Sequence, residues 1–148
     1  MPGAPGSWPV VRRHVEQFVL HLPHAQALGM ELLSCEEALG RCVIRLPWRE
    51  DLVGDPGTGV FHGGVITALL DTLGAASVIA RGRRLQGTLD LRIDYLRPAT
   101  TQVELFGDVE CYRVTRHVAF VRGSCHQGDP ARAVASLTAA FVLGEPKS

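Results

Sequence analysis

The sequence carries no excess of charge of either sign. Its 15 Lys and Arg residues balance its 15 Asp and Glu residues, and no run of like charges stands out along the chain. A protein that holds nucleic acid through the phosphate backbone needs a surplus of positive charge on one surface. The composition therefore argues against nucleic acid as a partner.

The four cysteines form no metal-binding pattern. Cys35, Cys42, Cys111 and Cys125 include no CxxC pair, and no two histidines accompany them at the spacing of a zinc finger. None lies at an electropositive helix start, where a thiol becomes a nucleophile. The GxSxG turn of serine hydrolases and the phosphate-binding P-loop are also absent. We therefore expect free thiols, no metal and no redox cofactor.

The start of the sequence shows no secretion signal. Residues 1–9 are rich in Pro and Gly and lack a basic start followed by an apolar run. We interpret them as a disordered lead and expect the protein to be cytoplasmic. Residues 10–145 are predicted to form a single domain, because a chain of this length buries roughly two thirds of its unfolded surface in one core.

The longest apolar stretch, residues 63–80, has the length of a short membrane span. Asp71 lies in its middle, and a carboxylate at that depth costs about 3 kcal/mol on membrane-insertion scales. Gly63, Gly64 and Gly74 weaken a membrane helix further. Apolar residues surround the segment and leave no polar face, which predicts a helix buried inside the protein and no contact with a membrane.

The segments on either side of this helix predict strands. Residues 10–21 have the apolar spacing of an amphipathic helix that Pro23 stops, and residues 51–60 are rich in turn formers and predict a loop. Strands are predicted within residues 30–47, as a hairpin, and near residues 88–96, 103–114, 117–126 and 132–143. Two strands before the helix and four after it do not repeat the βαβ order. The predicted fold class is α+β, with an antiparallel sheet of about six strands wrapped around one long central helix.

The first strand after the helix alternates strictly between apolar and charged residues. Leu89, Leu91, Ile93 and Tyr95 share one face, and Asp90, Arg92 and Asp94 share the other. Successive side chains of a strand point to opposite sides of the sheet. We therefore expect the apolar face of this strand to be buried.

Two features of the long helix are suited to chemistry. Gly63 and Gly64 leave backbone N–H groups without intrahelical partners at the positive end of the helix dipole, where they can stabilise the oxyanion of an acyl transfer. Alternatively, the glycines only let the preceding loop pack closely. Asp71 has small neighbours one turn away, which predicts a cleft beside a carboxylate that acts as a base or a nucleophile. The alternative is a carboxylate held by backbone donors of a neighbouring loop.

His62 precedes this helix directly. No Ser or Cys stands at a recognisable distance as its nucleophile, and a histidine in this place often caps the helix or packs against it. Catalysis by its imidazole is the less favoured interpretation.

Two stretches together resemble a known family. Residues 61–71 read Phe-His-Gly-Gly-Val-Ile-Thr-Ala-Leu-Leu-Asp, and residues 88–98 end in Tyr-Leu-Arg-Pro. Both resemble the hotdog-fold acyl-CoA thioesterases of the phenylacetate-degradation (PaaI-like) type, over about residues 28–141. The resemblance implies a six-stranded sheet around the helix, an acyl-CoA substrate hydrolysed without a cofactor, and a homodimer that joins two sheets edge to edge, often within a homotetramer.

The resemblance also implies roles for single residues. Gly63 supplies the N–H group toward the thioester carbonyl, with Gly64 beside it as a substrate-binding candidate. Asp71 acts as nucleophile or general base, His62 has a positioning role, and Thr88 orients the attacking water.

One position departs from the family pattern. Pro56 stands where several relatives carry an Asn, six residues before the histidine of the motif. Asp55 is the candidate to take over that polar role in substrate binding. Six arginines on turns or strand ends are candidates for the CoA phosphates, although ordinary solvated arginines are the alternative for each: Arg81, Arg83, Arg84, Arg97, Arg113 and Arg116.

The spacing of the two main candidates predicts a shared site. Gly63 and Asp71 stand roughly 12 Å apart along a helix that rises 1.5 Å per residue, too far for both to touch one carbonyl. If both are catalytic, one of them comes from another subunit. Two alternatives remain: a hotdog enoyl-thioester hydratase, whose pairing of a loop Asp with a downstream His is not found here, and a non-catalytic acyl-CoA binding module, which does not need Asp71.

Overall fold

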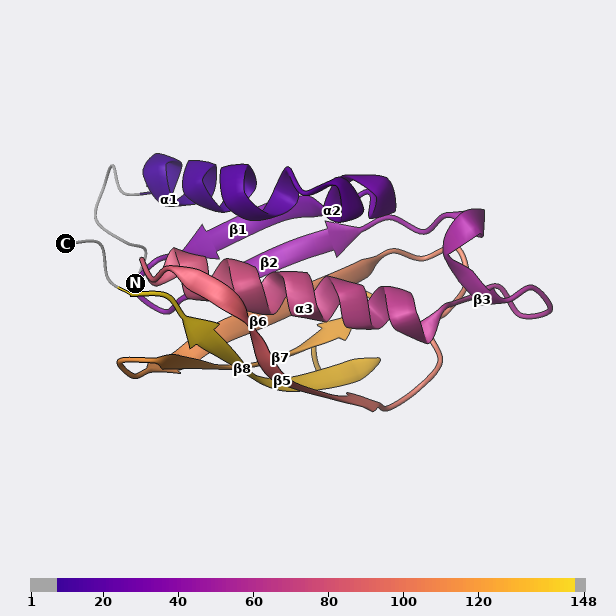
Figure 1. Cartoon of the computed structure of the whole chain (residues 1–148). Helices are drawn as coiled ribbons and strands as arrows, with labels where there is room; N and C mark the ends of the chain where they lie inside the picture. The colour runs from indigo at the N-terminus through magenta and orange to yellow at the C-terminus, as the bar shows by residue number, and fades with distance from the viewer. Residues whose placement is uncertain (1–7, 146–148) are drawn as a thin grey trace.

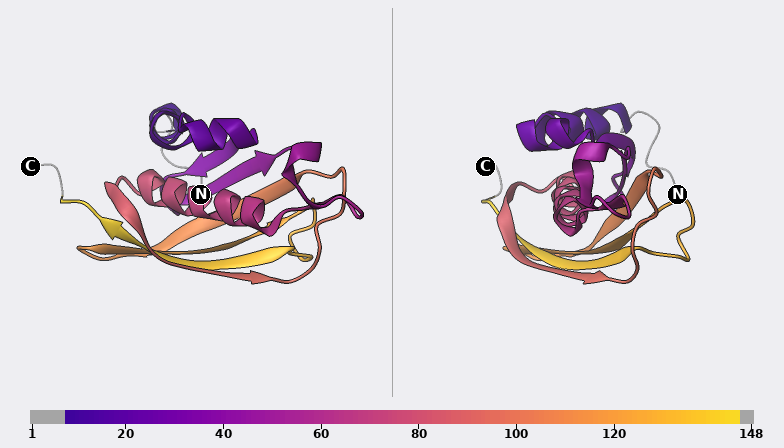
Figure 2. Two further views of the ribbon diagram at one scale, coloured as in Figure 1. Left: turned by 45° about the vertical axis from the view of Figure 1, so that its right-hand side comes forward. Right: turned by 90° about the vertical axis from the view of Figure 1, so that its right-hand side faces the viewer.

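The computed structural model describes residues 8–145 and confirms the predicted fold class. Six strands form one antiparallel sheet in the order β1-β2-β6-β7-β8-β5, and the long helix α3 (Gly63–Ala80) lies on its concave face (Figures 1 and 2). The strands are β1 (Glu31–Glu36), β2 (Arg41–Leu46), β5 (Leu85–Tyr95), β6 (Leu105–Val114), β7 (Val118–His126) and β8 (Ala135–Leu143).

Helix α3 forms the centre of the core. Leu69, Leu70 and Leu73 are fully buried against the sheet. Gly107 of β6 allows the close approach, because a Cβ there would overlap the side chain of Leu73. By length and mean hydropathy, 1.6, the helix would suit a membrane span. The sheet instead wraps around it, as the sequence predicts (Figure 2).

The prediction that α3 has no polar face is wrong on one side of the helix. Gly63, Thr67, Asp71 and Ala75 recur at every fourth residue, and all are only half-buried. Residues at this spacing lie above one another on a helix. These four residues, the helix stripe, face β5, because Thr88 of that strand donates a hydrogen bond to Asp71.

Strand β5 is an edge of the sheet, and its apolar face is not buried as predicted. Leu91 and Ile93 are half-buried, whereas Leu89 and Tyr95 are 59% and 54% exposed. An edge strand has a neighbour on one side only, so its side chains receive less cover.

A β-bulge explains the exposure of Leu89. Thr88 pairs with Phe141 of β8 and Asp90 pairs with Ala140, so Leu89 is an extra residue in β5. The alternation shifts by one residue at this point. Thr88 therefore faces α3, on the same side of the sheet as Leu91.

The N-terminal part contains one helix more than predicted. Helix α1 (Trp8–Val15) begins two residues before the expected start and continues as a π-helical segment (Glu16–Leu20), while the rest of the predicted lead, residues 1–7, lies outside the described residues. Pro23 ends this unit, as predicted, but it also begins helix α2 (Pro23–Leu28). Proline suits the first position of a helix because the N–H it lacks has no partner there.

The predicted loop 51–60 is partly ordered. It contains a 3-10 turn (Glu50–Leu52) and a small hairpin of β3 (Val53–Asp55) and β4 (Val60–Phe61), which projects beyond the start of α3 (Figure 1). The backbone N–H of His62 bonds to the carbonyl of Leu52 at 2.9 Å. This hydrogen bond ties the hairpin to the start of the helix.

Candidate active site

His62 caps the first turn of α3. Its Nδ1 accepts a hydrogen bond from the N–H of Gly64 at 2.8 Å, so Nδ1 carries no proton. A Cβ at position 64 would lie 2.9 Å from Nδ1, closer than Cβ atoms normally come, so the cap requires glycine. The N–H of Gly64 is thereby occupied within the chain. The geometry agrees with the capping interpretation of His62 and leaves Gly63 as the donor of interest.

The N–H of Gly63 has no acceptor among residues 8–145, the part of the chain that the structure describes. The peptide group between Gly63 and Gly64 is held at both its N–H and its carbonyl. The N–H of Gly64 bonds to His62. The carbonyl of Gly63 accepts from the Tyr95 hydroxyl at 3.0 Å and from Thr67 Oγ1 at 3.2 Å. The two hydroxyls also contact each other. The helix start is therefore fixed, with one backbone donor free at its positive end.

Tyr95 is a site residue to which the sequence assigns no role. It belongs to the Tyr-Leu-Arg-Pro stretch and lies on the same face of β5 as Leu91 and Ile93, the face toward α3. The feature of the sequence that could have pointed to Tyr95 is an aromatic residue at the end of that apolar face. Nothing in the alternation shows that its hydroxyl reaches Gly63, since that contact depends on where the helix begins.

A cavity of about 390 Å³ opens beside Gly63. Its lining is mainly apolar and comes from the helix start, from β4 and from the chain that follows β5: Val60, Phe61, Ile66, Tyr95, Leu96, Arg97, Pro98 and Ala99. Asp71 is not among the lining residues. An apolar cavity with one free N–H donor is suited to an acyl group whose carbonyl oxygen needs a hydrogen bond.

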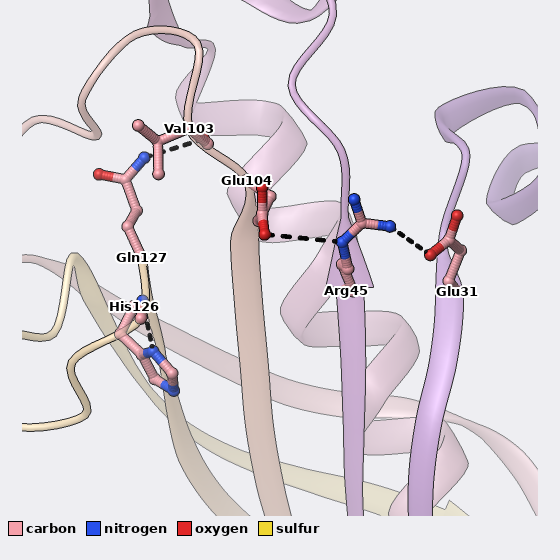
Figure 3. Close-up of polar contacts among 7 residues, drawn as sticks. Glu31, Arg45, Val103, Glu104, His126 and Gln127 are labelled. Carbon is pink, nitrogen blue, oxygen red and sulfur yellow. Dashed lines mark hydrogen bonds and ion pairs between the residues drawn. The ribbon is translucent and has the colours of Figure 1, made fainter.

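Side-chain hydrogen bonds tie the wall formed by residues 96–99, and the chain that follows it, to the connection between β7 and β8. The side-chain amide of Gln127 donates to the carbonyl of Val103 at 3.0 Å (Figure 3). Gln127 also accepts from the N–H of Thr100 at 2.7 Å and donates to the carbonyl of Thr100 at 2.8 Å. Arg97 Nε donates to the carbonyl of Ala133 at 3.1 Å. These contacts fix the wall and place Arg97 at the cavity.

The start of β6, where this wall segment leads, is also held by charge. Arg45 of β2 lies between Glu31 of β1 and Glu104, with nitrogen–oxygen distances of 2.6 and 3.8 Å (Figure 3). The three side chains are partly exposed, so water screens both pairs and they orient the strands more than they stabilise them.

Asp71 and Thr88, both predicted site residues, are brought together. Thr88 Oγ1 donates to Asp71 Oδ1 at 2.8 Å, and no backbone group among the described residues donates to this carboxylate. The alternative of an Asp held by loop donors therefore does not apply. The predicted cleft beside Asp71 is absent on the Gly74 side, because the ring of Phe141 occupies the space that a Cβ on Gly74 would need.

Asp55 lies in a turn of its own making. One carboxylate oxygen accepts from the N–H of Gly57 at 3.0 Å and the other from Thr58 Oγ1 at 2.9 Å. Both oxygens thus have partners inside the β3–β4 hairpin. The structure brings Asp55 into contact with neither Gly63 nor Asp71.

The six candidate arginines are divided between the two ends of α3. Arg97 lies at the cavity beside the helix start. Arg83 joins the turn after the helix to the β6–β7 turn, because it donates to the carbonyls of Thr115 and Arg116, both at 3.2 Å. Arg81, Arg83 and Arg84 belong to the turn after the helix, Arg116 belongs to the β6–β7 turn, and Arg113 lies near the end of β6 beside that turn. None of the five forms an ion pair with another described residue.

Cys111, Cys125 and the acidic residues supply no alternative catalytic centre. Burial raises the pKa of Cys125 to about 11 and also raises the pKa of Cys111, which disfavours the thiolate that a nucleophile needs. Among the described residues, no three His, Cys, Asp or Glu side chains gather as metal ligands would.

Comparisons with known proteins give the site a context. Residues 58–134 match the family described as the thioesterase superfamily. The chain is 32% identical over 146 residues to the medium/long-chain acyl-CoA thioesterase YigI of Salmonella typhimurium, covering 87% of this chain and 90% of that protein. A crystal structure from Pseudomonas aeruginosa is 37% identical, with a TM-score of 0.79 and coverage of 89% and 98%. A mutant of the phenylacetic acid degradation protein PaaI from Thermus thermophilus is 28% identical, with a TM-score of 0.70 and coverage of 81% and 97%.

Proposed function

The chain belongs to the thioesterase superfamily, and we propose that this acyl-CoA thioesterase of the hotdog, PaaI-like type uses Asp71 and the N–H of Gly63 to release a carboxylic acid and free CoA. The observation that carries the proposal is the hydrogen bond from Thr88 to Asp71, which holds a half-buried carboxylate on an otherwise apolar helix. Removing a carboxylate from water lowers stability unless hydrogen bonds or an opposite charge compensate. Among the described residues Asp71 has only the Thr88 hydrogen bond, to Oδ1, and Oδ2 keeps no partner. The name of the YigI relatives favours a medium or long acyl chain as the substrate class.

In the proposed reaction, Gly63 acts on the oxygen of the thioester carbonyl and Asp71 acts at its carbon. The thioester carbonyl oxygen accepts from the N–H of Gly63 and becomes negative as the carbonyl carbon is attacked, and the helix dipole stabilises that charge. Asp71 either takes a proton from the attacking water or attacks the carbon itself. Thr88 occupies Oδ1 in both cases and leaves Oδ2 toward the substrate. The proposal requires no metal or redox cofactor.

The distance between the two groups supports a site shared by two chains. Gly63 and Asp71 are separated by roughly 12 Å along α3, and the cavity at Gly63 is not lined by Asp71. One chain therefore does not present both groups to a single carbonyl. In a two-fold dimer, Gly63 of one chain meets Asp71 of the other, and symmetry creates the same site twice.

The free edge of the sheet supports a homodimer. Strand β5 ends the sheet, and the apolar side chains Leu89, Tyr95 and Leu96 are more than half exposed along it. An edge with exposed apolar residues is a template for pairing with another strand. Antiparallel pairing of β5 with β5 of a second copy places the two helix stripes side by side in opposite directions, and a homotetramer would combine two such dimers.

This dimer suggests how CoA is held. Arg97 lies at the cavity of its own chain, whereas the turn that begins with Arg81 lies about 15 Å beyond Asp71 along the helix. In an antiparallel pair, that turn extends past the helix start of the other chain. We therefore propose that Arg97 and the basic turns of the second chain are the contacts of the CoA phosphates.

The remaining alternatives are less well supported. A hydratase pairs a loop Asp with a His, but Asp55 uses both of its carboxylate oxygens within its own turn. A binding module has no need for the bond between Thr88 and Asp71. For the compartment we retain the cytoplasm, since all four cysteines are free thiols and thiols persist in a reducing environment.

A thiol-release assay tests the proposed function directly. We expect free CoA to appear from medium- or long-chain acyl-CoA with a higher kcat/KM than from short-chain or aromatic acyl-CoA. Binding of acyl-CoA without release of thiol from any of the four classes would favour the binding module. Addition of water across an enoyl-CoA double bond, with the thioester intact, would favour the hydratase.

Thr88 is expected to act through Asp71, and its substitution should be milder than that of the carboxylate. Thr88→Val removes the hydroxyl at nearly constant shape, and we expect kcat to fall roughly tenfold with little change in KM, because a misplaced carboxylate reacts more slowly. Thr88→Ser keeps the donor and should retain most of the activity. A loss as large as that of Asp71→Asn, or an equal loss in both Thr88 variants, would contradict the positioning role.

A further inference from the structure

Cys35 of β1 and Cys42 of β2 face each other across the first hairpin. They are direct partners in the register of the two strands, and their Sγ atoms are 3.1 Å apart. Opposed residues of antiparallel strands have Cα atoms about 4.5 or 5.5 Å apart, and a disulfide accepts roughly 4.4 to 6.8 Å. A bond between the two sulfurs therefore needs rotation of side chains but no shift of the strands.

A β-bulge creates this pair. Leu32 pairs with Ile44 and Ser34 pairs with Val43, so Leu33 is an extra residue in β1. Without the bulge, the alternation would bring Ser34 inward in place of Cys35. With it, Cys35 is 1% exposed and lies beside the fully buried Cys42.

The other two cysteines serve as internal controls because neither has a thiol partner. Cys111 Sγ contacts the carbonyl of Arg113 at 3.8 Å, and Cys125 lies on β7 between Gly107 and Ala135 of the neighbouring strands. Both are buried as completely as the facing pair. Burial alone therefore does not distinguish the four thiols, whereas the presence of a partner sulfur does.

The two facing thiols are also unequal. The hydrogen bond between the two sulfurs lowers the pKa of Cys35. The positive charge of Arg12 on α1 also lowers it, whereas burial and the charge of Glu37 raise it. The same hydrogen bond and burial raise the pKa of Cys42 well above its usual value. Cys35 is therefore the sulfur that reacts first, with Cys42 placed to resolve the product.

We propose that Cys35 and Cys42 form a dithiol oxidation site that hydrogen peroxide converts into an intramolecular disulfide linking β1 to β2. The Cys35 thiolate attacks one peroxide oxygen, the O–O bond breaks, and a sulfenic acid and water result once the leaving oxygen is protonated. Cys42 then attacks the sulfur of Cys35, the S–O bond breaks, and a second water leaves. Two thiols lose two protons and two electrons in total, and hydrogen peroxide is reduced to two waters. The site is independent of acyl-CoA hydrolysis.

The test treats the folded full-length protein with hydrogen peroxide. The protein is then unfolded in denaturant in the presence of a thiol-alkylating reagent, because Cys111 and Cys125 are fully buried in the folded chain. We expect the mass of the chain to fall by two hydrogens, a cross-linked peptide containing Cys35 and Cys42, and alkylation of Cys111 and Cys125. A reductant should restore all four thiols. The cross-linked form should also unfold at a higher temperature, because the bond restricts the unfolded chain.

Single substitutions sharpen the assignment. Cys35→Ser and Cys42→Ser should each abolish the loss of two hydrogens, and Cys42→Ser should leave a sulfenic acid on Cys35 that a dimedone-type reagent traps. Cys125→Ser is the matched control and should still form the cross-link. A cross-link through Cys111 or Cys125, four alkylated thiols after excess peroxide, or a lower unfolding temperature of the cross-linked form would overturn the proposal. The peptide map of the unsubstituted protein decides the matter even if a variant does not fold.

Discussion

Asp71→Asn is expected to lower the rate of CoA release about a hundredfold or more, the loss that follows removal of a general base or nucleophile. The amide has nearly the shape of the carboxylate, and its oxygen can still accept the hydrogen bond that Thr88 donates at 2.8 Å. The amide cannot take a proton from water or attack a thioester. We therefore expect kcat to fall while the unfolding temperature and the oligomeric size stay unchanged.

Asp90→Asn is the matched control for this substitution. Asp90 lies on the same strand as Thr88, is exposed, and forms no ion pair with another described residue. The Asp90→Asn substitution removes one negative charge beside the bulge of β5. It should leave kcat within about a factor of two of the value of the unsubstituted protein. A loss of less than tenfold in Asp71→Asn would remove the carboxylate from the mechanism. Equal losses in both variants would point to a general effect of charge.

The central helix was predictable because its signal is local. A mainly apolar stretch, broken only by isolated polar residues such as Asp71, begins after His62, and the basic turn that starts at Arg81 ends it. The predicted residues 63–80 therefore coincide with α3. The strands around it were predictable from alternation, and their number and antiparallel order followed from their place before and after the helix.

The contacts of the site depend on features that alternation does not show. An extra residue at Leu89 turns Thr88 toward Asp71, and an extra residue at Leu33 turns Cys35 toward Cys42. A bulge exists only relative to a partner strand, so the sequence of one strand does not reveal it. The family resemblance assigned Thr88 to the site, but the hydrogen bond to Asp71 required the structure.

Two other differences between the predictions and the structure, at Pro23 and at Asp55, have local causes. Proline ends one helix and fits the first turn of the next, so Pro23 was compatible with both roles and α2 was missed. Asp55 was assigned to substrate binding from its position in the motif. In the structure, the N–H of Gly57 and the hydroxyl of Thr58 bind its carboxylate and complete a turn.

A second large loss of activity is expected when the N–H donor of Gly63 is removed. Gly63→Pro removes the proposed donor N–H and should leave the homodimer almost inactive. The structure accommodates this proline: position 63 is the first residue of α3, and His62 before it has the extended backbone that a residue preceding proline prefers. A Cβ at this position would lie 3.5 Å from the ring of Tyr95, an ordinary contact. Gly63→Ala adds the Cβ but keeps the N–H, and it should retain most of the activity.

Mixing the two inactive chains tests whether they share a site. In a heterodimer of Asp71→Asn and Gly63→Pro chains, one site combines an intact Gly63 with an intact Asp71, and the other site carries both defects. Random reassortment yields about one half heterodimers, so refolding an equal mixture should restore about a quarter of the unsubstituted activity under two-fold symmetry. CoA release is measured after refolding, and differently tagged chains verify that heterodimers form. If verified heterodimers of folded chains stay inactive, Gly63 and Asp71 do not meet across a subunit boundary, and the shared-site mechanism is wrong.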